Sequence, residues 1–327
     1  MNILYIIGNG LDIAHHMNTS YQDFFRYYLN QPSADSDIRA MKKDIDSHRY
    51  ETWADLEMGM GEYSSQCPNK DIFLKCLADI KSSLKKYLEK ESEKIKLYKL
   101  KSTDFLNLGA FLEPEPKSRY NSYRKTVSSG LIIDVMTFNY TPTIEWLLEI
   151  NSNTRYLPDN TGIGSIQHVH GMLNDMMVMG VNDSSQISNN SFNTDEDVVE
   201  DFIKPEYNDA CMNNKNTICE SLISRADMIV LYGTSLGLSD LKWWRLIGQR
   251  MSKDNYPLLI YFPYDETKDQ TAQPNHLRRW VKQSIGEIKE KFDIQLDDNV
   301  LASRVCVAYN KRLFNIVKVS QQHDVKR

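Results

Sequence analysis

The chain has 327 residues, of which 41% are hydrophobic and 25% are charged, values typical of a globular protein with one large or two smaller domains. A formal net charge of −5 argues against a generally basic nucleic-acid-binding protein, and no segment approaches the roughly 18 consecutive apolar residues of a membrane span. The five cysteines form no C-x-x-C pair, which indicates reduced thiols and argues against zinc. We therefore expect a cytoplasmic protein that binds neither a membrane nor a metal.

The first predicted element is a strand. Residues Ile3 to Ile7 form a short apolar run that Gly8 ends, a pattern typical of a buried parallel strand. The run is too short for a secretory signal. The turn Gly8-Asn9-Gly10 follows, and the sequence then becomes helical.

Residues 19–125 differ from the rest of the chain, because they are rich in Lys, Glu, Tyr and Leu and contain little strand signal. The capping residues at 19–23 predict a helix that begins before Phe24. From Asp71 to about Leu108, apolar residues recur at spacings of three to five, which predicts one or two long amphipathic helices with a solvated lysine-rich face. We expect a helical insertion over 19–125.

Strands and helices alternate in the remainder of the chain. Residues 183–197 (DSSQISNNSFNTDED) are polar, and we expect a mobile loop or a segment that orders on binding. The predicted strands are Leu131–Phe138, Ser165–Val169, Met176–Val181, Ala226–Gly233, Leu258–Phe262 and Leu301–Ala308, and the predicted helices are Thr141–Glu149, Asp240–Met251 and Pro274–Lys291.

This alternation favours an α/β fold with a Rossmann-like parallel sheet and a large helical insertion after the first strand. The predicted domains are the sheet domain, residues 1–18 and 126–327, and the insertion, residues 19–125. Ligands of such sheets bind beyond the carboxyl ends of the strands, where the strand order reverses. The strand at 3–7 should lie inside the sheet, beside those at 131–138 and 226–233.

Four motifs follow predicted strands. In the first, Gly8-Asn9-Gly10-Leu11-Asp12, glycines allow close approach of the backbone to a phosphate at a helix N-terminus. It is not a complete G-x-G-x-x-G, since residue 13 is Ile. The alternative is that the glycines are needed at this turn for steric reasons alone. A side chain at Gly10 should therefore block nucleotide binding and leave the insertion unaffected.

In the second motif, Thr137-Phe138-Asn139-Tyr140-Thr141, Asn139 stands where a strand meets the next helix. Its amide suits a ribose hydroxyl or a water. The alternative is that Asn139 caps the helix, with Pro142 in its first turn.

The third motif is His168-Val169-His170-Gly171. On a strand the two histidines would share one face, yet no third ligand stands at a metal spacing. An imidazole at a strand end suits a general base, because its ordinary pKa lies near cellular pH. His170 is the better candidate because it lies nearer the strand's end, and His168 is expected to be structural.

The fourth motif is Gly233-Thr234-Ser235-Leu236-Gly237, whose hydroxyl groups suit a phosphate or a ribose. It also matches G-x-S-x-G, which would make Ser235 the nucleophile of a serine hydrolase. That interpretation requires a later acid and then a histidine, and downstream the chain offers only His276 and His323.

Taken in order, IIGNGLD, TSYQDFF, ETWADLE, FNYT, HVHG and LYGTSLGLSD resemble the bacterial abortive-infection AbiH family and, through it, the sirtuin-like NAD-binding fold. Sirtuins carry a Gly-rich first turn, an Asn after a middle strand, a His before Gly, and a G-T-S-L string. The matching residues here are Gly8–Gly10, Asn139, His170–Gly171 and Gly233–Leu236. The chain lacks the cysteines of the sirtuin zinc ribbon, so protein deacylation is not implied.

The resemblance implies an antiphage defence effector that hydrolyses NAD+ at the nicotinamide–ribose bond, with NAD+ as substrate and no other cofactor. Asn139 would orient the ribose or the attacking water, and His170 would act as general base. Gly8, Asn9 and Gly10 would cradle the pyrophosphate, and Thr234 and Ser235 would bind the adenosine half or a phosphate. The other expected binding residues are Asp12, Thr141 and Gly233. Asp12 has two expected roles, binding ribose or capping its helix, and Trp53, Glu57 and Tyr63 would close over the nicotinamide or pack in the core.

The resemblance also implies control. An effector that consumes NAD+ must be silent until triggered, so we expect a phage-derived trigger or a partner protein, and a homo-oligomer. The insertion and residues 183–197 are the candidate regulatory elements. The alternative function is a non-catalytic sensor that binds NAD or an ADP-ribose-type nucleotide and signals to a partner, with no need for His170 as a base.

Overall fold

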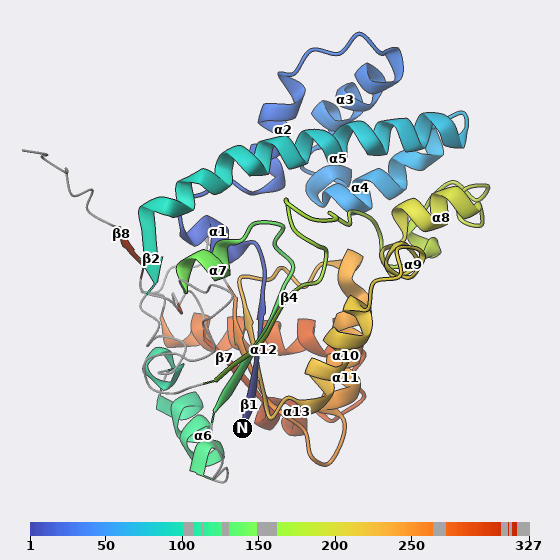
Figure 1. Ribbon diagram of the computed structural model, residues 1–327. Coiled ribbons are helices and arrows are strands. Elements are labelled where there is room, and N and C mark those ends of the chain that lie inside the picture. Colours follow the sequence, from blue (N-terminus) through green and yellow to red (C-terminus); the bar gives the residue numbers. More distant parts are fainter. Residues whose placement is uncertain are drawn as a thin grey trace, which may run out of the picture.

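The computed structural model describes residues 1–100, 108–112, 114–125, 131–148, 162–263, 273–308, 313 and 316–318. Figure 1 shows a parallel sheet with helices on both faces, and a group of helices across the end of the sheet that lies opposite the N-terminus of the chain. Since the strands are parallel and the first begins at the N-terminus, those helices cross the carboxyl edge of the sheet.

The first strand lies at the centre of the six-stranded sheet, whose order is β4-β3-β1-β5-β6-β7. Ile3 is in register with Ile133 on one side and with Met228 on the other, which confirms the predicted interior position. The strand order reverses at β1, as in doubly wound Rossmann-like sheets. The strands are β1 (Asn2–Ile7), β3 (Ile132–Thr137), β4 (Gly162–His168), β5 (Met228–Tyr232), β6 (Leu258–Phe262) and β7 (Val305–Val307).

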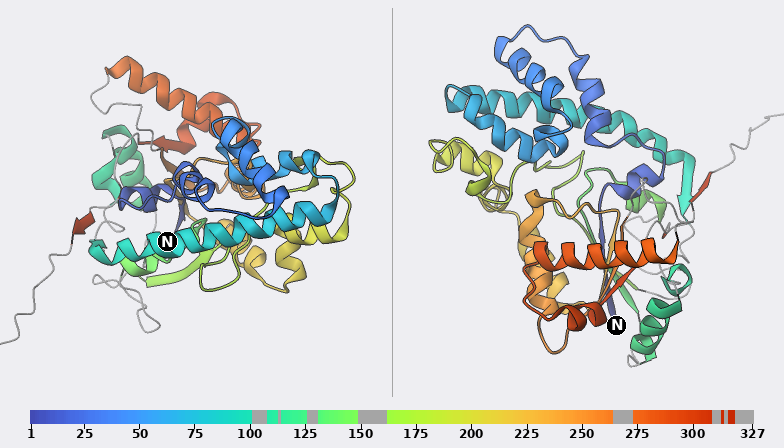
Figure 2. Two further views of the ribbon diagram at one scale, coloured as in Figure 1. Left: turned by 90° about the horizontal axis from the view of Figure 1, so that it is seen from above. Right: turned by 180° about the vertical axis from the view of Figure 1, so that it is seen from behind.

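Both faces of the sheet are buried, because the side chains of β1 alternate between two hydrophobic clusters. Ile3 and Tyr5 pack on the face that α1, α6 and α7 cover, whereas Leu4 and Ile6 pack under α10 to α13 (Figure 2). These helices are α1 (Gly10–Ala14), α6 (Pro114–Lys125), α7 (Thr143–Leu147), α10 (Lys215–Arg225), α11 (Leu241–Met251), α12 (Pro274–Lys291) and α13 (Asp298–Arg304).

A third cluster holds together what we call the helical layer, residues 21–92. Its fully buried aromatic side chains include Phe24, Trp53 and Phe73, and residues between Leu173 and Ile203 complete the same core. Ser20 caps the first of these helices by accepting a hydrogen bond from the Asp23 N–H, as predicted. The helices are α2 (Tyr21–Leu29), α3 (Ser36–His48), α4 (Leu56–Tyr63) and α5 (Lys70–Ser92), with α8 (Glu196–Phe202) and α9 (Lys204–Ala210) beside them.

Three predicted segments have different bounds in the structure. The long helix ends at Ser92, and the strand β2 (Tyr98–Leu100) follows and pairs antiparallel with β8 (Ile316–Lys318), a partner that periodicity cannot reveal. Residues 101–107 lie outside the described residues. Of the predicted strand 301–308 only β7 is extended. The residues before β7 belong to α13, whose N-terminus Asp297 caps. Helix α7 is shorter than predicted, and residue 149 is not described.

In residues 176–197 the expected strand is wrong, and so is the expected mobile loop at 183–197, whereas its alternative, a segment that orders on binding, stays a prediction. Met176–Val181 forms no strand beyond a single bridge at Val181, and its apolar residues pack into the core of the helical layer instead. Residues 183–197 do not form a detached loop. Phe192 is buried in that same core, and the Ser188 N–H donates to the Gly61 carbonyl oxygen at 3.1 Å. This segment therefore packs against α4 although its sequence is mostly polar.

The hydrophobic clusters bear on how the chain is divided. Helices α2 to α5 share the core of the helical layer, whereas Leu108, Leu112 and Tyr120 pack with the sheet. The division into a sheet domain and an insertion over 19–125 stays a prediction. Among the described helices, none has both the length and the apolar character needed to cross a membrane.

Candidate functional site

A cavity of about 420 Å³ lies between the carboxyl edge of the sheet and the helical layer. Small-molecule sites typically measure about 300–1,000 Å³, and the reversal point of a doubly wound sheet is where they form. The helical layer contributes Tyr21, Asp55 and Glu57 to the lining. All ten candidate residues from the sequence line it as well: Gly8, Asn9, Gly10, Asp12, Asn139, Thr141, His170, Gly233, Thr234 and Ser235.

The two glycine turns contact each other. The N–H groups of Gly8 and Gly10 donate to the carbonyl oxygens of Tyr232 and Gly233, at 3.0 and 2.9 Å. A Cβ atom on Gly10 would lie 2.5 Å from the Gly233 Cα, and Gly233 itself has φ +64°. The glycines are therefore required for the two strand ends to meet. While these hydrogen bonds persist, neither N–H group can bind a phosphate. The turn can then contribute to ligand binding only by shaping the cavity.

The side chain of Asn9 is engaged within the protein. Its Nδ2 donates to the Thr19 carbonyl oxygen at 2.8 Å, and its Oδ1 accepts from the Thr19 hydroxyl at 2.6 Å. Asn9 thereby ties the first turn of the sheet to the chain that enters the helical layer.

Asp12 neither caps its helix nor extends freely into the cavity. It is 2% exposed and accepts hydrogen bonds from Asn139 Nδ2 at 3.1 Å and from the Thr141 hydroxyl at 2.6 Å. Burial raises the pKa of Asp12 to about 6, against the opposing effect of hydrogen bonds from Thr141, Thr143 and Asn139. The carboxylate joins the ends of β1 and β3.

The two histidines have separate environments, so the prediction that they share a strand face is wrong. His168 ends β4, where its ring contacts the Asn139 carbonyl oxygen at 2.7 Å and Glu145 Oε1 at 2.8 Å. His170 lies in the following turn, which closes at Gly171 with φ +75°. Its Nε2 is 2.9 Å from Asp240 Oδ1. His168 is held structurally, as predicted, whereas His170 lines the cavity.

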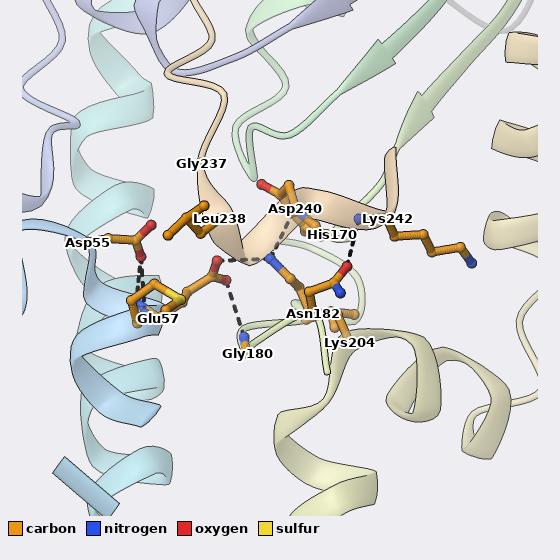
Figure 3. A network of polar contacts seen from close by, with 12 residues as sticks. Asp55, Glu57, His170, Gly180, Asn182, Lys204, Gly237, Leu238, Asp240 and Lys242 are labelled. Carbon is orange, nitrogen blue, oxygen red and sulfur yellow. Dashed lines mark hydrogen bonds and ion pairs between the residues drawn. The ribbon is translucent and has the colours of Figure 1, made fainter. Parts of the chain in front are cut away.

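His170 belongs to a buried charge network (Figure 3). Lys204, 5% exposed, places its Nζ 2.8 Å from Asp240 Oδ1 and 2.9 Å from Glu57 Oε2. Burial alone would raise the pKa of Asp240, but Lys204 and His170 hold it well below its usual value. Burial alone would lower the pKa of Lys204, but Asp240 and Glu57 raise it. The network thus joins the helical layer to the turn that carries His170.

Two buried oxygen atoms of the cavity lining have no hydrogen-bond partner among the described residues. These are Asn139 Oδ1 and Thr234 Oγ1, on side chains that are 6% and 8% exposed. The great majority of buried polar side-chain atoms in proteins are paired, and each exception calls for an explanation. A ligand that donates hydrogen bonds to both atoms provides one.

Sequence reasoning missed several residues of this site. Lys204 gave no signal, because a single lysine near a polar segment is ordinarily solvated. Glu57 was considered only together with Trp53 and Tyr63, which are buried in the helical layer. Asp240 was assigned only to a helix start, and it does precede α11. Asn139 does not cap α7, because the N-cap is Pro142.

The cavity lining offers hydroxyl, amide and carboxylate groups. In the part of the chain that the structure describes, no three His, Cys, Asp or Glu side chains are grouped to hold a metal. The described lining residues include Asp12, Asp55, Glu57 and Asp240 but no Lys or Arg. Hydroxyl, amide and carboxylate groups of this kind bind sugar hydroxyls and polarised rings.

Fold and site together define a Rossmann-like α/β protein with a polar cavity at the reversal point of its sheet. The chain belongs to the bacteriophage abortive infection AbiH family, whose model matches residues 4–262. The match begins within β1 and ends with β6, and it includes all residues named around the cavity. None of the curated proteins matches the chain.

Proposed function

We propose that the protein is an antiphage defence effector that hydrolyses NAD+ at the nicotinamide–ribose bond. Membership of the abortive infection family supports the role in defence. The observation that carries the reaction is the convergence of Asn139, Asp12 and His170 on one cavity, beyond the carboxyl ends of β1, β3 and β4. In this proposal the fold is sirtuin-like in its ligand site, and the family resemblance of the four motifs supports that detail.

The reaction requires few groups. The bond between the nicotinamide nitrogen and ribose C1′ breaks, and its electron pair leaves with nicotinamide. Water adds to C1′ and gives up a proton, so that the products are nicotinamide, ADP-ribose and a proton. Positive charge develops on the ribose in the transition state, and the nearby carboxylates favour it. No lysine or arginine among the described lining residues opposes that charge.

Each candidate residue has a role in this scheme. The unpartnered Oδ1 of Asn139 accepts a hydrogen bond from a ribose hydroxyl or from the attacking water. His170 takes the proton from that water or hydroxyl, and Asp240, 2.9 Å from its Nε2, stabilises the imidazolium that forms. Thr234 and Ser235 bind the adenosine half, as the free hydroxyl oxygen of Thr234 supports.

Such an activity must be controlled, and the helical layer is suited to that role. It covers the cavity, and Glu57 connects it through Lys204 to Asp240 beside His170. A trigger or partner protein that shifts the layer would change both access and the charge next to the base. The packed segment 183–197 adjoins the same layer and would move with it.

The test is to incubate the purified chain with NAD+ and measure free nicotinamide and ADP-ribose, with binding of NAD+ measured by calorimetry in parallel. Once the trigger is supplied, we expect turnover in the wild type and a loss of about 100-fold or more in Asn139→Ala. If NAD+ binds and Asn139→Ala weakens its binding, but no nicotinamide appears even when phage infection is used as the trigger, the protein is the nucleotide sensor instead. Absence of both binding and turnover would refute the proposal.

A further inference from the structure

The turn that precedes α11 lies against the start of α4, and both segments line the cavity. Figure 3 shows Asp55 at the start of α4, opposite the turn at Gly237 and Leu238. A Cβ atom on Gly237 would lie 3.6 Å from Asp55 Oδ2 and 3.7 Å from the Oγ atoms of Ser235 and Ser239. Three side-chain oxygens therefore surround one point, and all three residues line the cavity.

The two oxygens of Asp55 have different tasks. Oδ1 caps α4 by accepting hydrogen bonds from the N–H groups of Glu57 at 3.0 Å and Met58 at 3.2 Å. Oδ2 is the oxygen beside Gly237. Burial, with a smaller effect of Glu57, raises the pKa of Asp55 to about 6, so the carboxyl group is mostly ionised above neutral pH.

A second observation points to a ligand at this end of the cavity. The Thr234 hydroxyl precedes Ser235 directly and is the buried oxygen that lacks a partner among the described residues. The described lining contains no lysine or arginine, and Lys204, whose charge also acts on Asp55, lies between Glu57 and Asp240, so one lysine is shared by three carboxylates. A carboxylate beside hydroxyl groups binds sugar hydroxyls, and its negative charge repels a phosphate.

We propose that Asp55, Ser235 and Ser239 form a subsite for the unphosphorylated ribose diol of the adenosine half, and that Asp55 excludes nucleotides with a 2′-phosphate. The substrate class is therefore NAD+ and its ADP-ribose relatives, and not NADP+. This inference rests on the proposed function, because it deepens the assignment of the same cavity.

The experiment compares two ligands that need no catalysis, ADP-ribose and 2′-phospho-ADP-ribose, by calorimetry on the full chain. The wild type should bind ADP-ribose more tightly by roughly tenfold or more, because the extra phosphate meets an ionised carboxylate. Asp55→Asn keeps the capping Oδ1 and removes only the charge at Oδ2. In this variant the ratio of the two affinities should fall to about threefold or less.

A matched control is Asp35→Asn. Asp35 also caps a helix of the layer, since its Oδ1 accepts from the N–H groups of Asp37 and Ile38, and it does not line the cavity. Its ligand ratio should equal that of the wild type. Gly237→Ala is the second variant: Gly237 has φ −59°, and the methyl group would make ordinary contacts, so folding should be unaffected. The methyl group would project among the three oxygens, hinder the approach of the diol and weaken ADP-ribose binding by roughly tenfold.

The outcomes separate the two proposals. If neither ligand binds and NAD+ is neither bound nor hydrolysed, the proposed function and the subsite both fail. If ADP-ribose binds but the wild type accepts the 2′-phosphate equally well, the subsite alone is refuted. An unchanged ratio in Asp55→Asn, or unchanged ADP-ribose affinity in a folded Gly237→Ala protein, refutes it too.

Discussion

Asn139 Nδ2 donates to Asp12 Oδ1 at 3.1 Å, so a carboxylate in the first helical turn orients an amide that follows the β3 strand. Because the nitrogen of the amide is held by Asp12, its oxygen is left as an acceptor in the cavity. Asp12 is thus a positioning residue. The arrangement explains why a charged group is tolerated at the centre of the fold, since it receives a second hydrogen bond from Thr141.

Asn139→Ala should lower NAD+ turnover by about 100-fold or more, since it removes the acceptor that orients the ribose or the water. It should cost only about 1 kcal/mol of stability, the worth of one hydrogen bond. Thr141→Val is the control, because it removes the other hydrogen bond to Asp12 and leaves the Asn139 amide in place. Nicotinamide release and urea unfolding measure both effects. Equal losses of turnover in the two variants would show that Asn139 acts only through Asp12.

Asp12→Asn should change how stability depends on pH. Because folding raises the pKa of Asp12 from 3.8 to about 6, the folded state holds the proton more tightly than the unfolded state. The free energy of unfolding therefore falls as pH rises from about 4 to about 6, by up to about 3 kcal/mol from this group. Asparagine removes this contribution. Relative to the wild type, the variant should gain stability across that interval in urea unfolding at several pH values, and a constant difference would contradict the buried-carboxyl account.

Gly10→Val should destabilise the protein by several kcal/mol, because its Cβ would lie 2.5 Å from the Gly233 Cα, a clash between two backbones. From the sequence alone this variant looked like a selective probe of nucleotide binding. Thermal unfolding should instead show a large fall in Tm. A folded Gly10→Val protein of wild-type stability would mean that the two glycine turns do not meet as described.

The two expectations for Gly10→Val, weaker nucleotide binding from the sequence and lower stability from the structure, illustrate what the sequence could predict. The apolar runs at β1, β3, β5 and β6 specified a parallel sheet, and polar residues after each run marked its carboxyl edge. An apolar run predicts a single strand, and it does not reveal which of the turns at the strand ends contact each other. Gly10 could be assigned to a turn, but its contact with Gly233 depends on the pairing of β1 with β5.

The side of the site opposite the sheet was harder to predict for the same reason. Asp55 and Glu57 line the cavity only because the helical layer packs over it, and Lys204 reaches Glu57 from α9. No local pattern links these residues, because Lys204 is 147 positions from Glu57. The segment 183–197 looked mobile because it has few apolar residues, yet Ile187 and Phe192 suffice to fix it on the helical layer.

Lys204→Met should destabilise the protein by about 3–5 kcal/mol, because it leaves Glu57 and Asp240 buried without a cation. Lys70→Met is the matched control. Lys70 also contacts two carboxylates, Asp195 and Asp197, but at the surface, so its loss should cost about 1 kcal/mol or less. Urea unfolding of both variants measures the difference. Similar small losses would show that the buried network contributes no more than a surface ion pair.

The two histidines give the sharpest test of the chemistry. His170→Gln should lower NAD+ turnover by about 100-fold to 10,000-fold, the usual contribution of a general base, and leave NAD+ affinity within about threefold. His168→Ala should do the reverse. It removes contacts with the Asn139 carbonyl oxygen and Glu145, so stability should fall by about 2 kcal/mol while the base remains. Nicotinamide release, calorimetry and thermal unfolding of both variants separate the effects.

Loss of turnover in His168→Ala with full turnover in His170→Gln would reverse the assignment. If neither histidine affects turnover while NAD+ is still consumed, the base lies elsewhere in the cavity, and Asp12, with its pKa near 6, becomes the group to examine.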